Sequence, residues 1–170
     1  MSKKIILLAG PTASGKSKLA IQLAKQLNGE IINADSMQIY KEFSVLSSRP
    51  DSKEIKKAKH NLYGVISVKK NFSAGDWLKL AKNKINQCHK NTKIPIIAGG
   101  TGLYFKALTD GLVKIPNIPI KVRNKIRLMQ KKLGQKKFYN RLLKLDPIIK
   151  NTIEKNDVQR SIRALSLIHI

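Results

Sequence analysis

The stretch that most restricts the fold of this chain is GPTASGKS at residues 10–17. It matches the pattern G-x-x-x-x-G-K-[ST], and it lies between an apolar run, IILLA, and a helix-like run, KLAIQLAKQL. A strand, a glycine-rich loop and a helix in this order predict a phosphate-binding loop, in which backbone amides and the helix N-terminus surround an anion. Lys16 adds a positive charge, and the Ser17 hydroxyl is a candidate ligand for Mg²⁺. The predicted diphosphate- or nucleotide-binding residues are Gly10, Pro11, Thr12, Ala13, Ser14, Gly15, Lys16 and Ser17. The loop alone leaves open whether the ligand is ATP, another nucleotide or another diphosphate.

The segments around this loop alternate between strand-like and helix-like patterns. Apolar runs predict a buried strand at 4–9 and further strands in EIINADS, in KIPIIAGG and at the end of KKAKHNLYGVISV. Helices are expected at 16–28, at 74–90 with Ser73 as N-cap and Asp76 at its third position, and from Thr101 until Gly111. This alternation predicts an α/β fold with a parallel sheet of the phosphate-loop type.

The character of the sequence changes near residue 113. VKIPNIPIK contains two prolines and predicts a linker, whereas KVRNKIRLMQKKL, KKFYNRLLKL and DPIIKNTIEKN predict short amphipathic helices without strands. We therefore expect an α/β core over 1–112 and a basic helical insertion module over 113–165.

Charge is concentrated in the second part of the chain. The chain carries 34 Lys and Arg against 10 Asp and Glu, a net charge of +24, and residues 1–112 and 113–170 each contribute +12. A lysine-rich composition could come from an AT-rich genome, but a uniform bias would not double the charge density in one segment. The distribution favours a polyanionic partner, a nucleic acid, for the helical module.

Composition also argues against several classes of protein. Apolar residues make up 42% of the chain, and no run is long enough to predict a membrane span. The single cysteine, Cys88, excludes an internal disulfide framework and offers no metal cluster. We expect a cytoplasmic, monomeric protein that does not bind a membrane.

Three further clusters carry chemistry. Asp35, the first residue of DSMQIY, lies at the end of a predicted strand. Its spacing from the phosphate loop leaves three roles open: a catalytic base, a contact to magnesium or ribose, or the N-cap of the next helix. In AGGTGLY, Thr101 follows two glycines that permit close approach to a ligand, although a capped turn explains it equally. In NDVQRSIRAL, Gln159, Arg160 and Arg163 follow an Asn-Asp cap; they are either solvated or donors to nucleic acid.

GPTASGKS, DSMQIY, AGGTGLYFKAL and NDVQRSIRAL, in this order and at these separations, closely resemble the tRNA dimethylallyltransferases, also called the IPP transferase family. The resemblance runs from Lys3 to Leu165. It implies transfer of a dimethylallyl group from dimethylallyl diphosphate to the exocyclic amine of the adenine beside the anticodon. Accordingly, the phosphate loop would hold the diphosphate of the prenyl donor, although such loops are often described as ATP sites.

The resemblance also implies roles for individual residues. The catalytic residues would be Asp35 as general base, Lys16 with Mg²⁺ near Ser17 on the leaving diphosphate, and Thr101 in contact with substrate. The adenine would be flipped out of the anticodon loop into a channel, and the helical module would hold the anticodon stem. The implied tRNA contacts are Asp35, Ser36, Met37, Gln38, Thr101, Arg123, Gln159, Arg160, Ser161, Ile162 and Arg163.

The chain departs from the family pattern in two places. Leu46-Ser47-Ser48-Arg49-Pro50 stands where the family has G-T-A-K-P, which removes a glycine. The chain is also much shorter than family members, so we expect a C-terminally truncated fragment with poor solubility and little activity. Residues 166–170, SLIHI, resemble translated sequencing adaptor, which predicts non-native read-through.

Two other functions remain open at this point. A phosphate-loop kinase for a small nucleoside or metabolite would use ATP, with Asp35 activating a hydroxyl. A non-catalytic nucleic-acid binder would use the loop only as a nucleotide sensor, and would leave Asp35 and Thr101 without a role.

Overall fold

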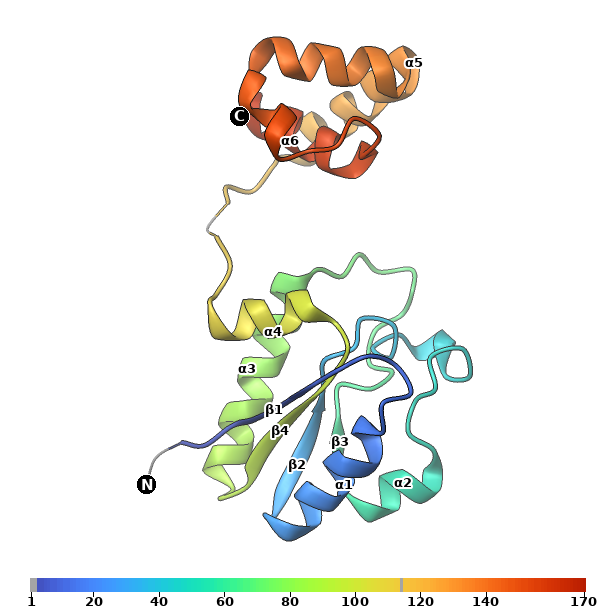
Figure 1. Ribbon diagram of the computed structural model, residues 1–170, viewed down its shortest axis with the longest axis vertical. Coiled ribbons are helices and arrows are strands. Elements are labelled where there is room, and N and C mark those ends of the chain that lie inside the picture. The colour runs from blue at the N-terminus through green and yellow to red at the C-terminus, as the bar shows by residue number, and fades with distance from the viewer. Residues whose placement is uncertain (1–2, 114) are drawn as a thin grey trace. The chain divides into compact units, whose positions relative to one another are not determined.

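A computed structural model describes residues 3–113 and 115–170 of the chain (Figure 1). The chain divides into two compact units, Met1–Leu112 and Val113–Ile170. Within the described residues no helix is long and apolar enough to cross a membrane.

The first unit is built on a four-stranded, entirely parallel sheet with the order β1-β4-β2-β3. Central strands β4 and β2 are buried on both faces, as is usual for parallel sheets covered by helices. In register, Ile6 lies opposite Ile96, Ile31 opposite Ile96 on its other side, and Ile31 opposite His60. The predicted α/β class with a parallel sheet is confirmed. The strands are β1 (Ile6–Ala9), β2 (Gly29–Asn33), β3 (His60–Asn61) and β4 (Ile94–Gly99).

Helices cover both faces of this sheet (Figure 1). On one face Ile31, Ile96 and Ala98 pack with the buried side of α1. On the other face Ile32 and Ile97 pack with α3 and α4, where the Trp77 and Tyr104 rings stack with centroids 4.3 Å apart. Adjacent residues of one strand therefore serve opposite cores, as strand alternation requires. The helices of this unit are α1 (Lys16–Gln26), the 3₁₀ turn η1 (Lys41–Phe43), α2 (Ser52–Lys57), α3 (Ala74–Lys90) and α4 (Gly102–Thr109).

The helix boundaries follow local chemistry. Ser73 caps α3 by accepting from Asp76 N while the Asp76 carboxylate accepts from Ser73 N, so the predicted cap and helix over 74–90 are confirmed. The helix predicted over 16–28 ends earlier, at Gln26, and Asn28 turns the chain with φ 51°. The helix expected to run until Gly111 ends at Thr109, and Gly111 has φ 85°.

Two strand predictions need correction. The strand at 4–9 is not fully buried: β1 is an edge strand, and Ile5 and Leu7 are 41% and 43% exposed. The strand predicted at the end of KKAKHNLYGVISV is not present there: β3 comprises only His60–Asn61, earlier in the segment, because Leu62 (φ 64°) and Gly64 (φ 59°) leave the extended region. Beyond them, the chain makes an isolated parallel bridge between Ile66 and Tyr40.

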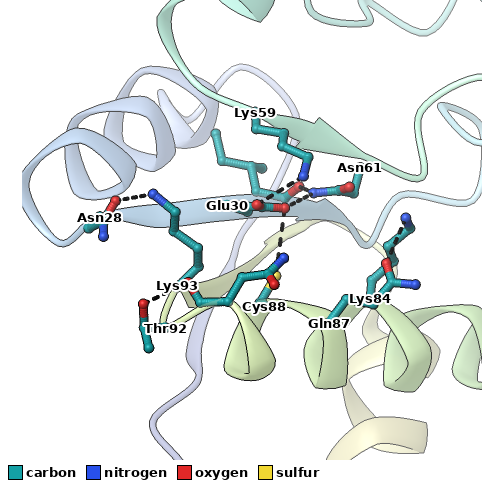
Figure 2. A network of polar contacts seen from close by, with 11 residues as sticks. Asn28, Glu30, Lys59, Asn61, Lys84, Gln87, Cys88, Thr92 and Lys93 are labelled. Carbon is teal, nitrogen blue, oxygen red and sulfur yellow. Dashed lines mark hydrogen bonds and ion pairs between the residues drawn. The ribbon is translucent and has the colours of Figure 1, made fainter.

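A buried polar network joins β2, β3 and α3 at the Glu30 carboxylate (Figure 2). Lys59 Nζ donates to Glu30 Oε1 at 3.0 Å and Asn61 Nδ2 to Oε2 at 3.1 Å, while the Cys88 thiol lies 3.8 Å from Oε2. Burial raises the pKa of Glu30, but the hydrogen bonds from Lys59 and Asn61 outweigh it and hold that pKa below its usual value. The carboxylate is thus kept charged inside the unit by its partners.

The second unit contains helices and connecting loops, and no strand among its described residues. The two helices predicted over 121–133 and 136–145 both lie within α5, where Gly134 (φ 70°, ψ 160°) is not helical and separates them by a kink. The segment after it is a 3₁₀ helix rather than an α-helix. The core contains Ile126, Phe138, Leu142 and Leu165. The elements are α5 (Ile120–Leu145), η2 (Pro147–Asn151) and α6 (Val158–Ile168).

Candidate active site

The phosphate loop forms a tight turn before α1. Gly15 has φ 80°, a conformation that favours glycine, and Ala13 also lies in the left-handed region with φ 62°. The Ser14 hydroxyl donates to the Pro11 carbonyl at 2.8 Å, and Lys16 Nζ donates to the same carbonyl and to Ser14 Oγ. The Lys16 ammonium group therefore lies over the loop.

Asp35 follows β2 at the carboxyl edge of the sheet. Its Oδ1 accepts from Met37 N at 2.8 Å and from Gln38 N at 3.4 Å, which is the turn-capping role left open by the sequence. In the described residues no hydrogen bond reaches Oδ2, and a Cβ atom built on Gly100 would lie 3.7 Å from it. One carboxylate oxygen thus holds the turn, and the other is available to a substrate.

Asn33, a residue that the sequence did not single out, fixes the backbone of Asp35. Its side chain is fully buried, accepts from Asp35 N at 2.9 Å and donates to Asp35 O at 3.0 Å. The same amide donates to Leu62 O at 3.1 Å, and Trp77 Nε1 donates to the Asn33 carbonyl. The signal in the sequence that could have identified Asn33 is a polar residue at the end of an otherwise apolar strand.

The turn containing Thr101 is attached directly to the Asp35 turn. Thr101 Oγ1 accepts from Ser36 N at 2.9 Å, and Thr101 N donates to Ala34 O at 3.1 Å. Thr101 is the N-cap residue of α4, but its side chain makes no capping hydrogen bond to that helix. Its hydroxyl proton remains free to be donated.

The first of the two glycines before Thr101 serves the fold. A Cβ atom built on Gly99 would lie 2.2 Å from the Ala34 carbonyl, so this glycine permits β4 to approach the chain that leaves β2. Gly99 and Gly100 both line the cavity described next. Both glycines therefore lie where a ligand could approach, and Gly99 has a structural role in addition.

One cavity of about 460 Å³ brings the phosphate loop and Asp35 together. Of the predicted residues, Gly10, Pro11, Ser36, Met37 and Thr101 do not line it. The predicted residues that do are Thr12, Ala13, Ser14, Gly15, Lys16, Ser17, Asp35 and Gln38. Lining residues that the sequence analysis did not propose as ligands are Lys18, Ala20, Ile31, Ser47, Ser48, Glu54, His60, Tyr63, Ala98, Gly99 and Gly100. His60 begins the edge strand β3 and Tyr63 follows it, and the rule that ligands lie beyond the carboxyl ends of strands could have found Tyr63.

The loop that departs from the family pattern packs against this cavity. Gln38 Nε2 donates to Ser47 O at 2.8 Å and to Ser48 O at 3.3 Å, so this amide supports the loop. Ser48 has φ 49°, and Arg49 Nη1 donates to the Tyr40 carbonyl at 3.2 Å. The chain keeps a left-handed turn here without glycine.

The requirements of Mg²⁺ fit the Ser17 side of the cavity. Ser17 is exposed, its hydroxyl makes no hydrogen bond to a described residue, and it adjoins Lys16. No group of three or more His, Cys, Asp or Glu that could hold a metal occurs among the described residues. Mg²⁺ commonly takes one or two protein ligands and completes its shell with phosphate oxygens and water, so one hydroxyl is compatible with it.

In the second unit a cleft of about 300 Å³ is surrounded by arginines. The predicted residues Arg123, Gln159, Arg160, Ile162 and Arg163 line it, together with Ile118, Arg127 and Ser166. Asp157 caps α6 and lies 3.5 Å from Arg160 Nε. Ser161, predicted as a tRNA contact, is fully buried and donates to Asp157 O at 2.6 Å, so its side chain does not reach the cleft.

Comparison with known proteins identifies relatives over almost the whole chain. The family model described as IPP transferase matches residues 38–170. A tRNA dimethylallyltransferase of Pelagibacter ubique is 59% identical over 164 residues, which are 96% of this chain and 52% of that protein. One of Methylocella silvestris is 44% identical over 163 residues, 96% of this chain and 54% of that protein. The chain thus spans about half the length of these relatives.

Solved structures of two proteins from relatives of this kind are also similar to the chain. A eukaryotic dimethylallyltransferase acting on tRNA is similar with a TM-score of 0.80 and 33% identity, over 95% of this chain and 40% of that one. The full-length tRNA isopentenylpyrophosphate transferase of Bacillus halodurans is similar with a TM-score of 0.65 and 31% identity, over 99% and 56%.

Proposed function

Because this chain belongs to the IPP transferase family, we propose that its protein transfers a dimethylallyl group from dimethylallyl diphosphate to a tRNA, at the exocyclic amine of the adenine 3′ to the anticodon. The observation that carries the proposal is that one cavity is lined by both the phosphate loop and Asp35. An anion-binding loop and an uncommitted carboxylate oxygen in one cavity suit a reaction in which a diphosphate leaves and a proton must be accepted.

The donor half of the site is the phosphate loop. Lys16, the loop amides and the N-terminus of α1 would bind the diphosphate and stabilise the charge that develops as it leaves. Ser17 would hold Mg²⁺ together with diphosphate oxygens, and the ion would neutralise part of that charge.

The acceptor half is the Asp35 turn. The adenine amine attacks the allylic carbon, a new N–C bond forms, the C–O bond to diphosphate breaks, and the amine proton passes to Asp35 Oδ2. Oδ1 stays bound to the amides of Met37 and Gln38, so the carboxylate keeps its orientation during the transfer. Thr101 would donate its hydroxyl proton to the substrate while it accepts from Ser36 N.

The arginine cleft of the second unit would contact the anticodon stem-loop. Arg123, Arg127, Arg160 and Arg163 are exposed around it, and Asp157 is the one carboxylate near them in the ion pairs of the described residues. Such crowding of positive charge is relieved by phosphates, to which guanidinium groups donate in pairs. A cytoplasmic, monomeric enzyme, expected from the sequence, belongs to the same proposal.

Equilibrium binding to the purified chain tests the donor half. Dimethylallyl diphosphate and ATP are compared, both with Mg²⁺, for the native sequence, Lys16→Ala and the control Lys25→Ala, whose side chain is exposed outside the cavity. We expect tighter binding of dimethylallyl diphosphate and at least ~10-fold weakening by Lys16→Ala alone. Preference for ATP would refute the transferase and favour the kinase; RNA binding without either ligand would favour the non-catalytic binder.

RNA binding at several salt concentrations tests the arginine cleft. Each phosphate contact that is lost lowers the slope of log K against log salt by about 0.7 to 0.9. We expect Arg163→Ala to lower the slope for an anticodon stem-loop by about that amount. Lys150→Ala, in η2 and outside the cleft, should leave it nearly unchanged. Equal effects of the two variants would contradict a specific role for the cleft.

A further inference from the structure

Tyr63 lines the cavity shared by the phosphate loop and Asp35, yet the proposed mechanism gives it no role. Its ring packs on the core face below α1, against the cluster that contains Ala20, Ile31 and Ala98. These three side chains line the same cavity. Tyr63 therefore lies where the phosphate loop adjoins the apolar side chains of the cavity wall.

The backbone fixes Tyr63 in this position. Leu62 before it and Gly64 after it both have left-handed φ values, 64° and 59°. Leu62 O accepts from buried Asn33, and Gly64 N donates to Gln38 O at 2.9 Å. A left-handed leucine is unfavourable and persists only where its surroundings impose it. The turn that carries this ring is thus held by hydrogen bonds on both sides of Tyr63.

Tyr63 and His60 together form an uncharged aromatic wall of the cavity. The two rings meet edge to face, with centroids 5.4 Å apart and planes at 72°. Burial lowers the pKa of His60, and its Nδ1 lies 2.8 Å from Ala58 O. Burial, followed by the charges of Asp35 and Glu54, raises the pKa of Tyr63, so the phenol stays protonated. An uncharged aromatic wall beside Ala20 and Ile31 suits a hydrocarbon group.

We infer that Tyr63 limits the length of the hydrocarbon group on the diphosphate ligand to one isoprene unit, because its ring occupies the space into which a longer chain would extend. This inference rests on the proposed function, since it assumes that the loop holds a prenyl diphosphate. The substrate class it selects is a short allylic diphosphate, and it excludes longer homologues by shape.

Competitive binding of dimethylallyl diphosphate and geranyl diphosphate, which differ by one isoprene unit, tests the inference. We expect the native chain to prefer dimethylallyl diphosphate by ~10-fold or more, the scale on which apolar pockets discriminate size. Tyr63→Ala should bind geranyl diphosphate at least ~10-fold better relative to dimethylallyl diphosphate. Tyr63→Phe, which keeps the ring, should retain the native preference. Val65→Ala is the control on the same turn, because Val65 is exposed and does not line the cavity.

Inorganic diphosphate binding and the fluorescence of the single tryptophan, Trp77, check that each variant is folded. Equal affinity of the native chain for both prenyl diphosphates would overturn the inference without any variant. An unchanged preference in folded Tyr63→Ala would overturn it as well. Both results leave dimethylallyl diphosphate binding intact, whereas failure of the proposed function would appear as preference for ATP. If Tyr63→Ala does not fold, Tyr63→Val replaces it with the same expected change.

Discussion

Replacing Asn33 by alanine should destabilise the first unit strongly, because this buried amide makes three side-chain hydrogen bonds to the backbone. They join Oδ1 to Asp35 N, and Nδ2 to Asp35 O and Leu62 O, at 2.9 to 3.1 Å. A net 0.5–1.5 kcal/mol for each bond predicts a loss of about 3 kcal/mol in the free energy of unfolding. With a urea m-value of about 2 kcal/mol/M, the unfolding midpoint should fall by about 1.5 M.

The assay is urea unfolding followed by tryptophan fluorescence. Trp77 is the only tryptophan, it is fully buried, and its Nε1 donates to the Asn33 carbonyl, so the signal reports the first unit. Asn83→Ala, at an exposed position of α3, is the matched control and should change stability by less than about 0.5 kcal/mol. A midpoint shift below about 0.3 M for Asn33→Ala, at unchanged m-value, would refute the reasoning.

Three further predictions concern the same unit. Glu30→Gln should lower the free energy of unfolding by about 1 kcal/mol at pH 7. Because folding lowers the pKa of Glu30, this difference between the two proteins should disappear as the pH falls below about 4.3. Urea unfolding at pH 7 and pH 3 measures it. Burial and the Glu30 carboxylate raise the pKa of Cys88 to about 11. Iodoacetamide at pH 8 should therefore alkylate Cys88 at least ~100-fold more slowly in the folded than in the unfolded chain. Mass spectrometry follows the reaction, and equal rates would contradict this prediction. Gly99→Ala, which brings a Cβ atom to 2.2 Å from the Ala34 carbonyl, should cost about 3 kcal/mol, whereas Gly102→Ala, with no atom within 4 Å, should be nearly neutral.

The sequence predicted the structure best where a structural feature depends on residues that are close together along the chain. The Ser73 capping box involves residues three positions apart, and the left-handed Gly15 belongs to a local motif. Composition and periodicity likewise separated the α/β segment from the helical one. These features could be predicted because their physical causes lie within a few residues of each other.

Features that depend on distant contacts were missed or misjudged. The length of β3 is set by the left-handed turn at Leu62, which is stabilised by Asn33 from another strand. Exposure of β1 follows from its place at the sheet edge, which its apolar sequence does not reveal. Tyr63 enters the cavity only because β3 pairs with β2. Whether the cavity residues bind donor and the cleft residues bind RNA stays a prediction, as does the non-native origin of residues 166–170.

The close attachment of the Asp35 and Thr101 turns has a consequence for protein engineering. Ala34 N donates to Ala98 O, Thr101 N to Ala34 O and Ser36 N to Thr101 Oγ1, and Gly99 leaves no space between them. Although 65 residues separate Ser36 from Thr101 along the chain, the two turns form one rigid piece. A chimaera that takes one turn from this chain and the other from a relative must therefore match two backbones at once, and exchanging both together is the safer crossover.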